Sequence, residues 1–422
     1  MKIQKNLKNN NNYILYMCFF LVFLLYLSIF FLSSFKIVNF WSFSQAHISY
    51  SEGFIKRGLF GTIMFFFEKN FNVSTRNFFS IFHIVFYSTN IFLFFKLIKK
   101  YLSNKLLFIF FVFCPSLILF PFNDLGGYQR LDVLSITTML IHSIIAESYY
   151  EKKINIVNYE RFLFFILFPF IFVSILFHEI QIISLPLHFF ITYGILNNRF
   201  SKTVKNYLFF LVPIFCVYFL YPNETSLIKL SQSVEQREIW IGAYLFHTKN
   251  LGLDHYINEI KINILTIYNF KLHLLMVFFS TIPFIIIFKY LKRNRIFLYY
   301  NKSNIFFFIV SPFFLGLIIG DFGRWVNLMS FAAFTYLSQF PLRKKLNDFK
   351  IYDKDIYKYF INLLILFIVI FYIFSIRIPH CCNLEEKNLN LFGGIIDKST
   401  AIIKIILNFS EDDIYNLDKR FK

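Results

Sequence analysis

The stretch YILYMCFFLVFLLYLSIFFLSSF, residues 13–35, contains no charged side chain and decides the class of the fold. A helix of about 20 apolar residues crosses a hydrocarbon core of about 30 Å, and a second run, YFINLLILFIVIFYIF at 359–374, has the same character. Lipid offers no hydrogen-bond partner to the backbone, and both runs are continuous rather than alternating, which excludes barrel strands. The sequence therefore predicts an all-α, polytopic transmembrane helical bundle.

The net charge of +19 is concentrated between the apolar runs. In a soluble protein this surplus would indicate a nucleic-acid partner, but here the positive-inside rule assigns the basic clusters to the cytoplasmic face. We therefore expect membrane lipids as partners and no nucleic acid. The clusters are Lys2/Lys5/Lys8, Lys96/Lys99/Lys100/Lys105, Lys152/Lys153/Arg161, Arg199/Lys202/Lys205, Lys289/Lys292/Arg293/Arg295/Lys302 and Arg343/Lys344/Lys345/Lys350.

Counting the apolar runs against these clusters predicts about eleven spans, with the N-terminus inside. An odd number of spans puts the C-terminal tail, 379–422, on the outer side, where a short helix on the membrane surface is expected. Residues 1–378 then form one transmembrane domain of an inner or plasma membrane, with long outer loops at 36–76 and 222–271. The predicted spans are 13–35, 77–98, 106–122, 131–148, 162–177, 180–197, 206–221, 272–290, 305–320, 325–340 and 359–378.

The sequence contains neither a nucleotide-binding fingerprint nor a metal-ligand pattern. A P-loop, an H-E-x-x-H and a G-x-S-x-G motif are all missing, and the five cysteines have no ligand spacing. We expect no metal and no cofactor, and the state of Cys381 and Cys382 stays open. A reaction on the outer side, away from ATP, needs a donor that is already activated, and a lipid phosphate ester is of that kind.

The polar clusters that interrupt the apolar pattern all fall on the predicted outer side. Charges held close to the bilayer surface are costly to desolvate, so each needs a partner or a function. The clusters are SEGFIKRG (51–58), NDLGGYQRLD (123–132), FHEI (177–180), EQREIW (235–240) and GDFGRW (320–325).

Three of these clusters contain arginines suited to an anion. Lys56 and Arg57 lie between Gly53 and Gly58, and a guanidinium grips phosphate with two parallel hydrogen bonds. The alternative is a pair of long side chains that extend from an interfacial helix to water. Arg130 and Asp132 enter the fourth predicted span, and Asp321 and Arg324 are spaced to pair across a tight turn; ordinary polar turns are the alternative for both.

His178 and Glu179 join two short predicted spans. A short span draws its connection into the bilayer edge, where burial disfavours the carboxylate and raises the pKa of Glu179 towards the range useful for proton transfer. The neighbouring His178 would relay or share that proton. The alternative is a helix break satisfied by backbone caps and an arginine. His142 and His188 are lone histidines in apolar spans and are interpreted as packing residues.

The span count, the orientation and the outer position of GFIKRG, HE and D-x-G-R-W resemble the GT-C-type integral membrane glycosyltransferases, which use polyprenyl-phosphate-linked sugars. They are also similar to uncharacterised bacterial membrane proteins of surface-polysaccharide assembly. The resemblance implies a lipid-linked sugar donor, a glycan acceptor and an acid in the first outer loop, which here is Glu52; the paired-acid signature of the family is missing. It assigns phosphate binding to Lys56, Arg57, Arg130 and Arg324, and the catalytic base to Glu179 or Asp124.

Three other functions compete with this interpretation. An O-antigen-type polymerase or ligase also gathers arginines on the outer side, commonly in larger loops such as 222–271. A transporter or lipid flippase would carry polar residues at the midplane and an inverted repeat, and neither is evident in the sequence. A membrane assembly subunit without catalysis is the third.

Overall fold

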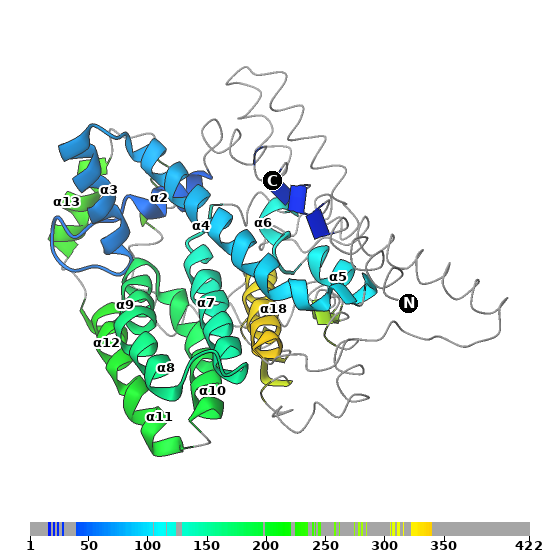
Figure 1. Cartoon of the computed structure of the whole chain (residues 1–422). Coiled ribbons are helices and arrows are strands. Elements are labelled where there is room, and N and C mark those ends of the chain that lie inside the picture. The colour runs from blue at the N-terminus through cyan, green and yellow to red at the C-terminus, as the bar shows by residue number, and fades with distance from the viewer. Residues whose placement is uncertain are drawn as a thin grey trace, which may run out of the picture.

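The computed structural model describes most of the chain between residues 39 and 234, and one further helix. Every described element is a helix (Figure 1), so the all-α prediction is confirmed for this part of the chain. The continuous described ranges are 39–103, 105–114, 116–123, 129–196, 199–220, 224–234 and 322–339, with isolated positions elsewhere. Outside the described residues lie most of 13–35, 235–271, 272–290 and 305–320, and all of 359–378 and 379–422.

Three described helices are long and apolar enough to cross a membrane: Thr75–Leu102, Ile156–Phe177 and Phe200–Val217. The first two contain the predicted spans 77–98 and 162–177. The third corresponds to the predicted span 206–221 and begins six residues earlier, at Phe200. The chain is therefore a membrane protein. The total of eleven spans and the sides on which the two termini lie remain predictions.

The predicted span 106–122 is wrong as a single helix. The helix α5 (Lys105–Val112) is followed by turns, and helix resumes only in the short α6 (Phe120–Asn123). The sequence carries Pro115 between them, and proline has no amide hydrogen to donate and clashes with the carbonyl one turn earlier. Apolar length alone therefore overestimated the helix at this point.

The centre of the bundle is α7 (Val133–Tyr150), which packs between α4 (Thr75–Ile98) and α18 (Phe322–Ser338) (Figure 1). Every residue from 323 to 339 is buried, as is the first half of α7, 133–140. By contrast, α4 exposes Ile81, Val85 and Phe92 on one side. Exposed apolar side chains at helical spacing are expected where a helix faces lipid. Polar side chains on α7 and α18 are thus held inside protein.

The predicted outer loop 36–76 folds into two helices, α2 (Phe40–Ala46) and α3 (Gly58–Phe71). The helical spacing expected after the basic pair is confirmed by α3. A Cβ atom on Gly61 would lie 2.0 Å from the carbonyl oxygen of Ile48, so only glycine allows α3 to cross the chain there. This crossing fixes the start of α3 and with it Arg57, which precedes the helix with a left-handed φ of 68°.

The second half of the described region is a run of helices that reverses at His178. The helix α9 (Phe168–Phe177) ends there, because His178 is extended, with φ −161° and ψ 122°. The 3-10 helix η3 (Glu179–Ser184) begins at the next residue and leads into α10 (Leu185–Ile195). The predicted break at His178 and Glu179 is confirmed. The other elements are η1 (Lys99–Ser103), α8 (Ile156–Phe162), η2 (Leu163–Leu167), α11 (Phe200–Tyr207), η4 (Leu208–Phe210), α12 (Leu211–Phe219) and α13 (Glu224–Val234).

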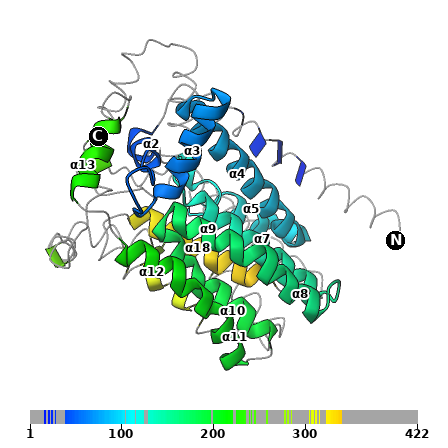
Figure 2. The same ribbon diagram turned by 90° about the vertical axis from the view of Figure 1, so that its left-hand side faces the viewer.

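The helix α13 lies beside α2 and α3 in both views (Figures 1 and 2). Leu230 and Val234 of α13 pack with Ile48, Ile55 and Tyr244 in a small apolar cluster separate from the main core. The start of the predicted second outer loop therefore packs against the first, as expected of loops that fold onto the bundle.

Candidate functional site

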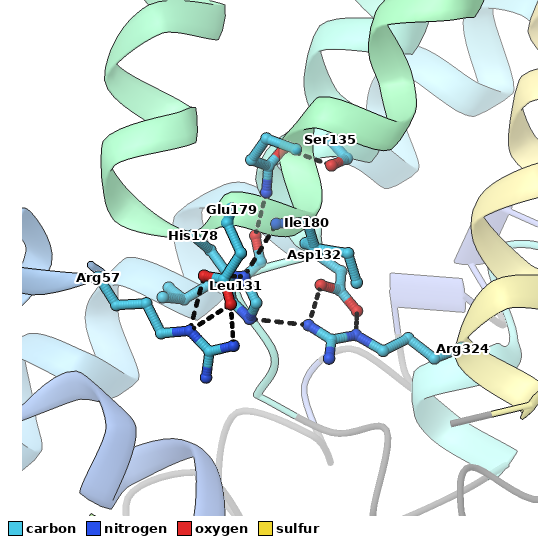
Figure 3. A network of polar contacts seen from close by, with 9 residues as sticks. Arg57, Leu131, Asp132, Ser135, His178, Glu179, Ile180 and Arg324 are labelled. Atoms are coloured by element: carbon cyan, nitrogen blue, oxygen red, sulfur yellow. Dashed lines mark hydrogen bonds and ion pairs between the residues drawn. The ribbon is translucent and has the colours of Figure 1, made fainter. Parts of the chain in front are cut away.

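Two ion pairs from distant parts of the chain, one partly buried and one buried, meet where α3, α7, η3 and α18 begin (Figure 3). The first joins Arg57 to Glu179, 122 positions away. The Nε atom of Arg57 donates to both carboxylate oxygens, at 2.7 Å to Oε2 and 2.9 Å to Oε1, and Nη2 contacts Oε1 as well. The side chains are 14% and 18% exposed, so this pair is the more accessible of the two.

The second pair joins Arg324 to Asp132, 192 positions away, and is more deeply buried. Its Nη2 atom donates to Oδ1 of Asp132 at 2.6 Å while Nε contacts Oδ2, and the side chains are only 7% and 9% exposed. Planar guanidinium and carboxylate groups match in this two-bond geometry. Asp132 precedes α7 and Arg324 lies in the first turn of α18, so the pair links the two central helices.

His178 connects the two ion pairs. Two donors face its ring: Nη2 of Arg324, 2.9 Å from Nε2, and the backbone N–H of Ile180, 3.2 Å from Nδ1. A neutral imidazole accepts at one nitrogen only, and arginine can only donate. The shorter, charge-assisted contact therefore makes Nε2 the acceptor and leaves the proton on Nδ1, which lies 3.4 Å from Oε2 of Glu179.

A second polar layer holds the helix break in place beneath the ion pairs. Gln181 in η3 donates from Nε2 to the carbonyl of Leu131 at 3.1 Å, and the hydroxyl of Ser135 on α7 donates to its Oε1 atom. Gln181 and Ser135 are each 1% exposed. These bonds tie η3 to the start of α7, so they fix the side chains of His178 and Asp132 relative to each other.

The electrostatics of Glu179 correct the sequence-based expectation. Burial does raise the pKa of this carboxyl, as predicted, but the charge of Arg57, with His178 beside it, outweighs burial and holds the pKa well below its usual range. The partner of Glu179 lies 122 positions away in the sequence, so only the effect of burial could be predicted from the sequence. In this arrangement Glu179 is a carboxylate, and it becomes a base for a hydroxyl group only when Arg57 is drawn away from it.

Burial, with the positive charge of Arg57, lowers the pKa of His178 to about 4. The imidazole is therefore neutral at pH 7, in agreement with its role as an acceptor from Arg324. A neutral ring between a carboxylate and a guanidinium has one proton to give, at Nδ1, and one lone pair that is already used. The carboxylate oxygen near this N–H is Oε2 of Glu179, 3.4 Å away.

Both shifts predict that acid destabilises the fold. Below about pH 6.5, His178 takes up a proton in the unfolded chain, but in the folded chain it does so only below about pH 4, so the free energy of unfolding decreases as the pH falls. Glu179 lowers the free energy of unfolding further as the pH falls towards its own lowered pKa. Each pH unit changes the free energy of unfolding by about 1.4 kcal/mol per titrating group, so His178 alone lowers it by about 2 kcal/mol at pH 5. We expect the Tm of the purified protein to fall between pH 7 and pH 5, and to fall less steeply in His178→Gln. Equal slopes in the two proteins would contradict the assignment.

The other predicted site residues are only partly gathered here. Arg130 is 7% exposed and its charge acts on Asp132, and Lys56 adjoins the Arg57 and Glu179 pair. Glu52, by contrast, makes no hydrogen bond or ion pair within the part of the chain that the structure describes. Asp124 and Asp321 lie outside the described residues, and the described carboxylate partner of Arg324 is Asp132.

Two features of this part of the bundle were not predicted from the sequence. The first is the contact of Gln181 with Ser135, although Asp132 and Ser135 are one turn apart and share a helix face with His142. The second is the contact of His142 with His188, whose Nδ1 atoms lie 2.8 Å apart. Within the described residues, no group of three His, Cys, Asp or Glu side chains is arranged to hold a metal ion.

Comparisons with family models, curated proteins and solved structures found no match to this chain. The candidate site therefore rests on its own geometry, and the resemblance to GT-C-type glycosyltransferases remains a prediction.

Proposed function

We propose that the protein is an integral membrane glycosyltransferase that takes a polyprenyl-phosphate-linked sugar on the outer face and transfers the sugar to a glycan acceptor. The observation that supports this proposal is the meeting of Arg57, Arg324, His178 and two carboxylates from four separate segments (Figure 3). Arginines bind phosphate with two parallel hydrogen bonds, and they stabilise the negative charge that a phosphate leaving group develops.

Lys56 is the cation best placed to receive the phosphate first. It is partly buried, and it makes no hydrogen bond or ion pair with any described residue. Burial, together with the neighbouring charge of Arg57, lowers the pKa of its ammonium group. The charge of Glu179 opposes this shift, but that carboxylate is already paired with Arg57, so two partly buried cations share one anion. A phosphate between Lys56 and Arg57 would supply the second anion.

Phosphate binding would also activate the base. The phosphate competes with Glu179 for Arg57, and as the guanidinium turns to the phosphate, burial is left to raise the pKa of the released carboxylate. The acceptor hydroxyl then gives its proton to Glu179 while its oxygen forms a bond to the anomeric carbon. The bond from that carbon to the phosphate oxygen breaks, and its electron pair stays on the phosphate. Asp132 keeps Arg324 and His178 in place throughout.

The proposal predicts a specific stabilisation by polyprenyl phosphate. A ligand that binds only the folded state raises the free energy of unfolding by about 2.7 kcal/mol at one hundred times its Kd. The Tm of the purified protein in detergent should therefore rise with polyprenyl phosphate and not with polyprenol, which lacks the anion. Lys56→Gln should abolish most of this rise. Lys69→Gln, which changes an exposed lysine in the last turn of the adjacent helix α3, should preserve it.

The transfer step needs a separate assay. Membranes that contain the protein should release polyprenyl phosphate from radiolabelled polyprenyl-phosphate sugars, and membranes with Lys56→Gln should do so with a raised KM. An equal Tm response to polyprenol and polyprenyl phosphate, or equal release with and without the protein, would count against a phosphate-dependent transferase.

An O-antigen-type polymerase or ligase would use the same arginines on a different donor, a glycan carried by a lipid pyrophosphate. The same thermal assay with polyprenyl pyrophosphate separates the two functions, because the better ligand should give the larger rise in Tm. A transporter, a flippase or a subunit without catalysis would release no polyprenyl phosphate.

A further inference from the structure

A second polar cluster lies deeper in the bundle, between α7 and α10, and does not belong to the ion-pair site. His142 and His188 are both fully buried, and their rings stack with centroids 5.1 Å apart and an angle of 16° between the ring planes. Their Nδ1 atoms lie 2.8 Å apart, which is hydrogen-bond distance. One ring must therefore donate and the other accept, so the two imidazoles share one proton position.

The cluster continues through hydroxyl groups to one end of the bundle. Nε2 of His142 lies 2.7 Å from the hydroxyl of Tyr159 on α8. That hydroxyl lies 3.4 Å from Oγ1 of Thr192 on α10, which lies 3.1 Å from the hydroxyl of Tyr207 on α11. Each hydroxyl can accept one proton and release another. These contacts form an unbroken chain of hydrogen bonds from His142 towards the end of the bundle that carries Lys153 and Lys202.

The other end of this chain is an unsatisfied nitrogen. Nε2 of His188 is buried and has no hydrogen-bond partner among the residues that the structure describes. If Nδ1 of His188 donates to His142, Nε2 of His188 carries a lone pair with no donor facing it. If Nδ1 of His188 accepts instead, Nε2 carries a proton with no acceptor facing it. Either state leaves a buried polar atom unpaired, at a cost of about 1 to 3 kcal/mol. A proton donor arriving at this atom would remove the cost, so the geometry marks the point where a proton enters.

The polar side chains above His188 lead back to the ion-pair site. One helical turn earlier lies Ser184, 2% exposed, whose hydroxyl donates to the carbonyl of Gln181 at 2.7 Å. Gln181 in turn bonds to Ser135 and to the carbonyl of Leu131, next to Asp132. Buried polar groups thus lie along the contact of α7 with η3 and α10, but among the described residues the hydrogen bonds stop at Ser184 and begin again at His188, one helical turn later.

We propose that these groups conduct protons through the helix bundle: a proton reaches Nε2 of His188 from the side of the ion-pair site, and the hydrogen bonds from His188 to Tyr207 carry it to the opposite end. Hydronium gives a proton to Nε2 of His188 and becomes water, while the proton on Nδ1 of His188 passes to Nδ1 of His142. The proton on Nε2 of His142 then passes to the Tyr159 oxygen, the Tyr159 proton to Thr192 and the Thr192 proton to Tyr207. Tyr207 releases its own proton to a water molecule, which becomes hydronium. Every step breaks one N–H or O–H bond and forms another, so charge moves without oxidation or reduction.

The test measures proton flux through the purified full chain in lipid vesicles. Vesicles loaded with a pH-sensitive dye receive a step in external pH, with potassium and valinomycin present to cancel the membrane potential. Wild-type protein should admit protons faster than protein-free vesicles. His188→Gln, which fills the site but cannot take up a proton at neutral pH, should return the flux to the protein-free level. Tyr159→Phe should do the same, because it removes one hydroxyl and little volume.

Two matched variants serve as controls. His83→Gln changes another fully buried histidine, on α4 and outside the proton chain, and Tyr149→Phe changes a ring 5.9 Å from that of Tyr159 whose hydroxyl is outside the chain. Both should conduct like the wild type. Wild-type flux equal to that of empty vesicles overturns the proposal, as does unchanged flux in either Tyr159→Phe or a folded His188→Gln. If His188→Gln does not fold, Tyr159→Phe alone decides the question.

Discussion

Replacing Asp132 with asparagine is expected to lower the free energy of unfolding by about 3 to 5 kcal/mol, because it leaves the charge of Arg324 buried without its carboxylate. The Arg324 side chain is 7% exposed, so water has little access to replace the lost carboxylate. The His178 ring, which also contacts Arg324, offers one lone pair and no negative charge. The loss should be measured by thermal and denaturant unfolding of the purified protein in detergent.

The control for this prediction is the double variant Asp132→Asn with Arg324→Gln. Removing both charges of a buried pair is often close to neutral, so the double variant should regain most of the lost stability. The exposed pair of Glu160 and Lys202 provides a second comparison: Glu160→Gln should cost about 1 kcal/mol or less. If Asp132→Asn costs no more than Glu160→Gln, the Arg324 and Asp132 pair does not hold the central helices together.

Replacing Glu179 with glutamine is expected to reduce sugar transfer by about 100- to 10,000-fold, the range for loss of a general base. Glutamine keeps the shape of the side chain and an amide oxygen that can accept from Arg57, but it cannot take the proton of an acceptor hydroxyl. The measurement is the release of polyprenyl phosphate from membranes adjusted to equal amounts of protein. This prediction rests on the proposed function.

The matched control is Glu147→Gln. Glu147 pairs with Lys100 at 2.8 Å, and these side chains are 19% and 13% exposed, close to the values for Glu179 and Arg57. Glu147 lies at the other end of α7 from Asp132, so its loss should lower stability by a similar amount and leave transfer intact. Equal activity losses in the two variants would show that Glu179 acts through stability alone. Inactivation by Glu52→Gln instead would move the base to the first outer loop.

Several elements followed from the sequence because their signals are local. The apolar run at 162–177 and the helical spacing after Arg57 each lie within a few turns, and helix formation depends on neighbours three or four positions apart. The break at His178 was also readable, since a polar pair interrupts two apolar runs. The prediction of one helix over 106–122 was wrong because it was based on the number of apolar residues and did not treat Pro115 as a helix breaker.

By itself, the sequence determined the helical class, the membrane as solvent, and which polar residues would be difficult to bury. Only the tertiary structure decided how those residues pair. Arg57 meets Glu179 because Gly61 lets α3 cross the chain at Ile48, and Arg324 meets Asp132 because α18 packs along α7. The energy of a charge depends on its distance from other charges, and that distance is set by packing across more than a hundred positions. For this reason the direction in which the pKa of Glu179 shifts could be predicted only once the structure placed Arg57 beside it.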